Sequence, residues 1–197
     1  MVETGLTISE AERHARLRLL RADAVGPATF HAVLARFGSA VNALRHWSDI
    51  ARRLRKSGTL ALPSVDSIRR EIDAIRAFSA TLIAHDEPGY SRMLAGTEPC
   101  PPFLIVKGRA ELLAQPAIAV VGSRNASAIG QRFARSIASD LGAAGFAVVS
   151  GLARGIDTAA HKGSFETGTI AVMAGGLDVV YPPENGRLHS EIAERGL

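Results

Sequence analysis

Three short segments rich in glycine have the residue types of an anion site, and each follows directly after an apolar run. Glycine lets the backbone approach a ligand closely, and free N–H groups at the start of a following helix favour negative charge. Serine hydroxyls and one arginine add further donors and a permanent positive charge. The sequence therefore predicts a phosphate pocket formed by Gly122-Ser123-Arg124, Ser150-Gly151-Leu152-Ala153 and Gly175-Gly176.

Alternating strands and helices are needed to position these segments. Three apolar runs have the composition of buried strands: 117–121, 146–150 and 169–173. In the helix expected after the first run, large apolar residues recur at the four-residue spacing of an amphipathic helix: Phe133, Ile137 and Leu141. Strands that are apolar throughout indicate an α/β, Rossmann-like parallel sheet with helices on both faces. The carboxyl ends of the strands, where ligands bind in such sheets, would then lie side by side.

The first 80 residues predict a different kind of domain. Apolar residues recur there at helical spacing between turns that contain glycine or proline, which indicates a small helical bundle. Short apolar runs at 81–84 and 103–106 are then typical of strands. We therefore expect two domains, a helical one at 1–80 and a Rossmann-like one at 81–197.

Composition narrows the class of protein. Of the 197 residues, 47% are hydrophobic and 21% are charged, the profile of a soluble globular protein. Residues 1–80 hold 13 Lys/Arg against 8 Asp/Glu, including the cluster Arg52-Arg53-Leu54-Arg55-Lys56, whereas residues 81–197 hold 10 against 11. Such a basic excess is compatible with nucleic acid. The chain shows neither a secretory signal nor an apolar run long enough to cross a bilayer, so we expect no membrane association and a cytoplasmic location.

Several common sites are missing from the sequence. After Gly122 the next glycine is Gly130, so the dinucleotide fingerprint is absent, and no glycine-rich loop ends in Gly-Lys-Ser/Thr. Cys100 is the only cysteine and no Cys/His cluster accompanies it, so no metal site is expected. We interpret Asp157 as a helix cap and His161 as a packed histidine, because no nucleophile or metal partner accompanies them. No catalytic residue and no cofactor is predicted.

The motifs around the glycine segments resemble one family, the DNA-processing protein A family (DprA, also called Smf), in order, spacing and surrounding strands. The helices around Val25-Gly26-Pro27 are more loosely similar to that family's sterile-alpha-motif-like domain. Residues 85–94 resemble its entry into the Rossmann-like domain, with Ser91 where proline is expected. The strongest matches are Val120-Val121-Gly122-Ser123-Arg124, the run from Ser150 to His161, Ala174-Gly175-Gly176-Leu177-Asp178 and Tyr181-Pro182.

This resemblance implies a protein without catalysis that binds single-stranded DNA, loads the recombinase RecA in natural transformation and forms homodimers. The family continues with further strands, so we expect the Rossmann-like domain to be incomplete at Leu197. Phe165, near the pocket, is a candidate for stacking on a base. Carried onto this sequence, the implied phosphate contacts are Gly122, Ser123, Arg124, Ser150, Gly151, Arg154, Gly155, Lys162, Gly175 and Gly176.

Two enzyme classes are alternatives to the hypothesis of a DNA-binding protein without catalysis. Phosphoribohydrolases of the lysine-decarboxylase-like type also place two glycines after a strand and bind nucleotides. They carry a Pro-Gly-Gly-x-Gly-Thr run with a following glutamate, whereas this chain has Ala174-Gly175-Gly176-Leu177-Asp178. A NAD-dependent dehydrogenase should have an acidic residue after its second strand, where Ser150 and Gly151 stand instead. Both departures count against these enzymes.

Overall fold

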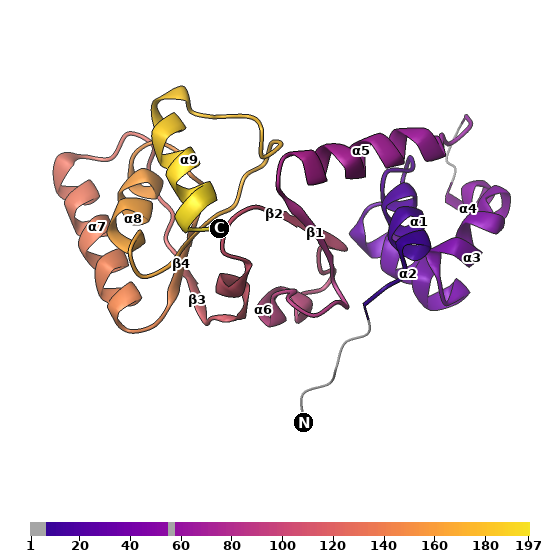
Figure 1. The fold of residues 1–197 in the computed structure, drawn as a ribbon, viewed down its shortest axis with the longest axis horizontal. Coiled ribbons are helices and arrows are strands. Elements are labelled where there is room, and N and C mark those ends of the chain that lie inside the picture. The colour runs from indigo at the N-terminus through magenta and orange to yellow at the C-terminus, as the bar shows by residue number, and fades with distance from the viewer. Residues whose placement is uncertain (1–6, 55–57) are drawn as a thin grey trace. The chain divides into compact units, whose positions relative to one another are not determined.

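The computed structural model describes residues 7–54 and 58–197, and the chain divides into two compact units between residues 105 and 106 (Figure 1). Arg55 and Lys56 of the basic cluster lie outside the described residues. Within the described ranges, no helix combines the length and the apolar character needed to span a membrane.

Short helices make up most of the first unit. Serine side chains cap several of them; for example, Ser9 Oγ accepts a hydrogen bond from Glu12 N at 3.2 Å. Residues 40–54 form two helices: His46 ends the first, and its carbonyl oxygen accepts a hydrogen bond from Asp49 N in the first turn of the second at 3.1 Å. The helices are α1 (Glu10–Leu20), α2 (Pro27–Phe37), α3 (Ala40–Arg45), α4 (Trp47–Leu54) and α5 (Val65–Ala77).

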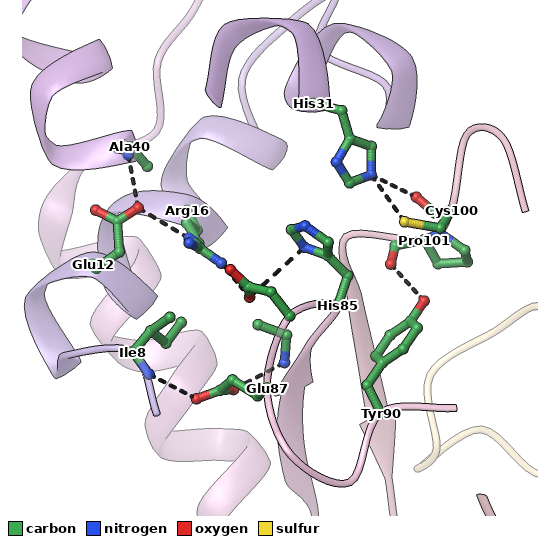
Figure 2. Close-up of polar contacts among 12 residues, drawn as sticks. Ile8, Glu12, Arg16, His31, Ala40, His85, Glu87, Tyr90, Cys100 and Pro101 are labelled. Carbon is green, nitrogen blue, oxygen red and sulfur yellow. Dashed lines mark hydrogen bonds and ion pairs between the residues drawn. The ribbon is translucent and has the colours of Figure 1, made fainter. Parts of the chain in front are cut away.

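The segment after α5 belongs to the same compact unit. It contributes a two-stranded sheet of β1 (Thr81–Ala84) and β2 (Phe103–Val106), and the short helix α6 (Arg92–Ala95). Polar contacts join it to α1 and to the residues before α1 (Figure 2): Arg16 Nη1 bonds Asp86 Oδ1 at 2.6 Å, and Ile8 N donates to Glu87 Oε1 at 3.2 Å. The domain boundary at residue 80 stays a prediction, whereas the compact unit extends to residue 105.

The second unit is built on a parallel sheet with the strand order β3-β4-β5. Its register pairs Ala119 with Val149 and Ser150 with Ala171. This sheet confirms the α/β fold expected from the apolar runs, although each strand is shorter than its run. The elements are η1 (Ala110–Ala114), β3 (Ala117–Ala119), α7 (Ala128–Ala143), β4 (Ala147–Ser150), α8 (Ile156–Ser164), β5 (Thr169–Ala171), η2 (Pro183–Asn185) and α9 (Gly186–Arg195).

Both faces of this sheet are covered. On one face, Val148 of β4 packs with Ala138 of α7 and Ala160 of α8. In α9, Leu188 and Ile192 pack with Leu152 of the loop after β4. The other face of the sheet carries a cluster of Leu112, Ala147, Ile170 and Leu197.

The buried face of α7 differs from the one that the sequence pattern indicates. Phe133 is 66% exposed and Ile137 is 36% exposed. Small residues are buried instead, because α8 approaches closely: a Cβ on Gly163 would lie 3.0 Å from the Cβ of Ala138. Large side chains do not fit between helices at that separation, so they point to solvent. The buried residues of α7 are Ala134, Ala138 and Gly142.

Candidate functional site

The glycine segments begin along one edge of the sheet. Val120 N donates to Val149 O at 2.9 Å, and Val172 N donates to Ser150 O at 2.8 Å. The first residues of the loops after β3, β4 and β5 therefore form a row, as expected for the carboxyl ends of parallel strands. The residues at these positions, Val121, Gly122, Gly151 and Val172, are exposed.

The loops after β3 and β4 are packed tightly against each other. Ile156 N donates to Ser123 O at 3.2 Å. Gly155 has φ +78°, and a Cβ there would lie 2.8 Å from Arg124 O, so only glycine fits. A Cβ on Gly122 would lie 2.8 Å from Cγ1 of Ile156. Gly122 and Gly155 thus have a structural task, which is to let the two loops meet.

Asp157 holds the loop after β4 from within. Its carboxylate is buried, and Oδ2 accepts hydrogen bonds from Gly151 N at 3.2 Å and Ala153 N at 3.3 Å. The N-cap of α8 is Gly155, so the interpretation of Asp157 as a helix cap was wrong. The carboxylate binds the loop that precedes the helix, because that loop curls back over it.

Asn185 also holds the loop after β4, and the sequence analysis did not identify this residue. Its Nδ2 donates to Leu152 O at 2.9 Å and to Thr158 Oγ1 at 2.8 Å, while Thr158 Oγ1 donates to Ala153 O at 2.7 Å. These bonds fix Leu152, whose φ of +56° is unusual for a residue other than glycine. Asn185 lies in η2, directly after the Tyr181-Pro182 motif, which was the available signal.

The hydrogen-bond donors of the two loops differ in availability. In the loop after β4, the N–H groups of Gly151 and Ala153 bind Asp157, and Ile156 N binds Ser123 O. In the loop after β3, by contrast, the N–H groups of residues 122–124 donate to no acceptor within the described part of the chain. Ser123 Oγ accepts from Asn125 N at 3.1 Å, which leaves its own O–H to donate. The N–H groups of Leu152, Arg154 and Gly155 are likewise unbonded within the described residues, so the loop after β3 is distinguished by three consecutive unbonded amides beside a hydroxyl that can donate.

Ser150 is placed differently from Ser123. Its side chain is buried, and Oγ donates to Val120 O at 2.7 Å. That bond ties the end of β4 to the end of β3 and engages the hydroxyl proton. Ser150 therefore positions the loops.

The cations around the loops have different surroundings. Arg124 is exposed and makes no ion pair with a described residue. Arg154 is also exposed, with Nη1 3.7 Å from Glu184 Oε1, a pair worth little in water. Lys162 is exposed in the last turn of α8, about 10 Å along the helix from Gly155.

The third segment is exposed at the same end of the sheet. Gly175 and Gly176 lie in the loop that follows β5, and Val179 N donates to Gly176 O at 3.0 Å to close a turn. A Cβ on Gly175 would come no closer than 3.8 Å to Val179, so this position has ordinary space.

Two residues weighed for other roles are packed. His161 is fully buried, with Nδ1 2.7 Å from Thr169 Oγ1, and burial lowers its pKa to about 4. It is a neutral, packed histidine, as expected. Phe165 packs beside Leu188 and Ile192, and the Arg195 guanidinium lies 4.7 Å from its ring centroid. These contacts already use the ring that was a candidate for stacking on a base.

No group of three or more potential metal ligands occurs among the described residues. In the first unit, Sγ of the buried Cys100 lies 3.3 Å from Nε2 of His31, and the rings of His31 and His85 are 4.6 Å apart (Figure 2). His31 thus contacts Cys100 by a hydrogen bond and His85 by edge-to-face packing.

A parallel sheet with helices on both faces, glycine loops at its carboxyl edge and a helical unit before it define a Rossmann-like protein with an added helical domain. Residues 81–197 match the family model of DNA recombination-mediator protein A, and residues 10–74 match that of the DprA-like N-terminal HHH domain. The chain therefore belongs to the DprA family.

Individual relatives agree with this assignment. Protein Smf of Synechocystis is 40% identical over 118 residues, 57% of this chain and 30% of the relative. DNA processing protein DprA of Streptococcus pneumoniae is 46% identical over 94 residues, 47% and 33% of the two chains. The putative DprA of Mycobacterium tuberculosis is 34% identical over 151 residues, which cover 76% of this chain and 36% of the relative. The chain thus spans about a third of the length of these relatives.

Two solved structures are similar to the fold. The crystal structure of DprA from Streptococcus pneumoniae has a TM-score of 0.69 at 27% identity. The matched region covers 97% of this chain and 66% of the Streptococcus pneumoniae chain. DNA processing protein A from Helicobacter pylori, whose structure concerns a single-stranded DNA binding mode, has a TM-score of 0.53 at 25% identity, covering 59% and 52%.

Proposed function

We propose that this chain binds single-stranded DNA by its phosphates, at the loop after β3, and acts without catalysis as a recombination mediator. The observation that carries the proposal is the set of donors at residues 122–124, which point to no partner within the described chain. Unpaired N–H groups, a free hydroxyl and an arginine on one exposed loop are complementary to a phosphate.

The remaining predicted contacts take different parts in this proposal. Gly122 and Gly155 let the loops interlock, and Ser150 and Gly151 belong to the support beneath them. Arg154 exchanges Glu184 for a neighbouring phosphate, since an exposed pair at 3.7 Å is easily displaced. Gly175 and Gly176 leave room for the backbone of the strand, and Lys162 meets a more distant phosphate.

The wider function follows the family and is part of the same proposal. We propose that the protein containing this chain loads RecA onto single-stranded DNA in natural transformation, and that it works as a homodimer. Membership of the DNA recombination-mediator family and the single-stranded DNA named for the Helicobacter pylori protein support this choice over a nucleotide-binding enzyme.

The test is fluorescence anisotropy with a labelled single-stranded oligonucleotide over a series of salt concentrations. Arg124→Ala should weaken binding roughly 10- to 100-fold, the loss expected for a charged hydrogen bond. It should also lower the slope of log K against log salt by about 0.7, one phosphate contact on a single strand. Arg69→Ala, which removes an exposed arginine of α5, is the matched control and should bind like the wild type.

Two results would count against the proposal. One is equal affinity of Arg124→Ala and Arg69→Ala. The other is absence of binding by the folded wild type together with stabilisation by a mononucleotide, which would favour the phosphoribohydrolase alternative.

A further inference from the structure

Helices α2, α3 and α4 of the first unit carry a concentration of positive charge (Figure 1). Residues 24–65 hold six Lys/Arg against one Asp/Glu, whereas helix α5 holds three of each. The segment 24–65 thus accounts for the whole basic excess of residues 1–80. The members that the structure describes are all exposed: Arg36, Arg45, Arg52 and Arg53.

The arginines of these helices differ from those of α1 and α5 in their partners. Ion pairs tie arginines of α1 and α5 into the unit; for example, Arg21 Nη2 lies 2.8 Å from Glu71 Oε1. The side chains of Arg36, Arg45 and Arg53, by contrast, form no ion pair and no hydrogen bond with any residue that the structure describes. Their guanidinium N–H groups are therefore available to an outside partner.

One aromatic ring joins the ends of α2 and α3. The Arg36 guanidinium lies 5.5 Å from the ring centroid of Phe37, and the His46 ring stacks on Phe37 at a centroid distance of 5.4 Å. His46 Nδ1 donates to Asn42 O at 3.0 Å, because a carbonyl oxygen can only accept. Arg45 and His46 follow Asn42 by three and four residues, so they lie on the same side of this helix end. The surface thus brings two unpaired arginines and an imidazole together.

Two carboxylates lie on neighbouring elements, and both are already engaged. The carboxylate of Glu12 accepts hydrogen bonds from Ala40 N at 2.7 Å and from Arg16 Nε at 2.9 Å. Asp49 Oδ1 lies 3.2 Å from Arg52 Nη2 in an exposed pair. Because each carboxylate has its own donors, the unpaired arginines keep the surface positive.

The composition of this surface selects a polyanion over a protein or a membrane. None of the large apolar side chains that are exposed in the described chain belongs to α2, α3 or α4. A protein interface has an apolar, desolvated core, and a helix that lies on a membrane inserts apolar side chains. A phosphodiester backbone presents negative charge and hydrogen-bond acceptors, which guanidinium groups match.

We propose that Arg36 and Arg45, at the ends of α2 and α3, form a second phosphate contact for single-stranded DNA, separate from the loop after β3. The identity of the polyanion rests on the proposed function. Phe37 holds the Arg36 guanidinium in place, so little side-chain freedom is lost when a phosphate binds. The surface lies about 15 Å along α2 from its N-cap, Gly26, and is therefore distinct from the turn that precedes this helix. It contacts the backbone, so it adds affinity without sequence preference.

The experiment measures the anisotropy of a labelled single strand, and of a duplex of equal length, over a series of salt concentrations. Arg36→Gln/Arg45→Gln should bind the single strand roughly 2- to 30-fold more weakly, the loss of two exposed charge pairs. The slope of log K against log salt should fall by about 1.4, two phosphate contacts on a single strand. Arg36→Lys/Arg45→Lys keeps both charges and should keep the slope. The matched control, Arg69→Gln/Arg70→Gln, removes two exposed arginines from the charge-balanced α5 and should bind like the wild type.

Each other outcome is decisive. An unchanged slope in Arg36→Gln/Arg45→Gln, with Arg124→Ala still weakened, would overturn the second contact and leave the proposed function standing. An equal fall in the α5 control would show that only net charge matters, and would overturn the second contact as well. A loss of duplex affinity with unchanged single-strand affinity would overturn the choice of a single strand. A wild type that binds no single strand would overturn both proposals.

Discussion

Replacement of Gly155 by alanine should push apart the loops that follow β3 and β4. The residue has φ +78°, and a Cβ there would lie 2.8 Å from Arg124 O. Positive φ costs an L-residue ~1–2 kcal/mol, and relieving the overlap adds roughly 1–3 kcal/mol. We expect the second unit to lose about 2–5 kcal/mol of stability in total. DNA affinity should fall as well, because Ser123 and Arg124 move.

Gly145 provides a matched control in the same unit. Its φ is +89°, and a Cβ there would meet nothing within 4 Å. Gly145→Ala therefore has the backbone cost without the steric overlap, and should lose only ~1–2 kcal/mol and retain its DNA affinity. The difference between the two variants measures the close approach of the loops.

The assay has to report on the second unit alone. The single tryptophan, Trp47, lies in the first unit, so its fluorescence follows the other half of the chain. Hydrogen exchange of the amides in β4 and α8 measures the opening of the second unit directly. Equal loss of protection in Gly155→Ala and Gly145→Ala would refute the argument that the two loops require glycine at residue 155.

Acid should weaken the two units for different reasons. Burial lowers the pKa of His161 from 6.5 to about 4, so the unfolded state is protonated at higher pH than the folded state. The second unit should therefore lose ~2 kcal/mol of stability between pH 7 and pH 5. Hydrogen exchange, corrected for intrinsic exchange rates, measures this loss. No loss, or an equal loss in His161→Gln, would contradict this assignment. In the first unit, burial raises the pKa of Glu87, but the hydrogen bond from Arg13 and backbone N–H groups outweigh it, so the pKa lies below its usual value. The stability from Glu87 is thus present at neutral pH and lost as pH falls through this lowered pKa, and Glu87→Gln should cost about 3–5 kcal/mol at pH 7 by Trp47 fluorescence. Glu71→Gln, in an exposed pair, should cost under about 1 kcal/mol, and a similar cost for both variants would show that burial of Glu87 is unimportant.

The sheet could be predicted from sequence because its strands are apolar on both faces. Residues such as Val148 and Ile170 face opposite layers of the unit, and both layers need apolar side chains. The packed face of α7 could not be predicted in the same way. Periodicity locates an apolar stripe, but the distance between helices decides whether Phe133 or Ala134 is buried, and that distance depends on Gly163 in another helix.

The loops show a second limit of sequence reasoning. Residue types indicated a polar, glycine-rich edge, and the structure places those segments together. The acceptor of each donor, however, depends on the fold: Ser150 bonds a strand carbonyl, and Asn185 reaches Leu152 across 33 residues of sequence. Neither bond leaves a periodic pattern, so residue type alone could not separate a positioning residue from a ligand-binding one.

The use of donors within the loops decides where an anion can bind. Beneath Gly151 lies the carboxylate of Asp157, which a Cβ on that glycine would meet at 2.9 Å. A phosphate placed there would face a negative charge and amides that are already bonded. At residues 122–124 no carboxylate intervenes and the amides are unpaired within the described chain. In the proposed function, the loop after β4 is therefore a support held by Asp157, and the loop after β3 is the surface that binds the phosphates of DNA.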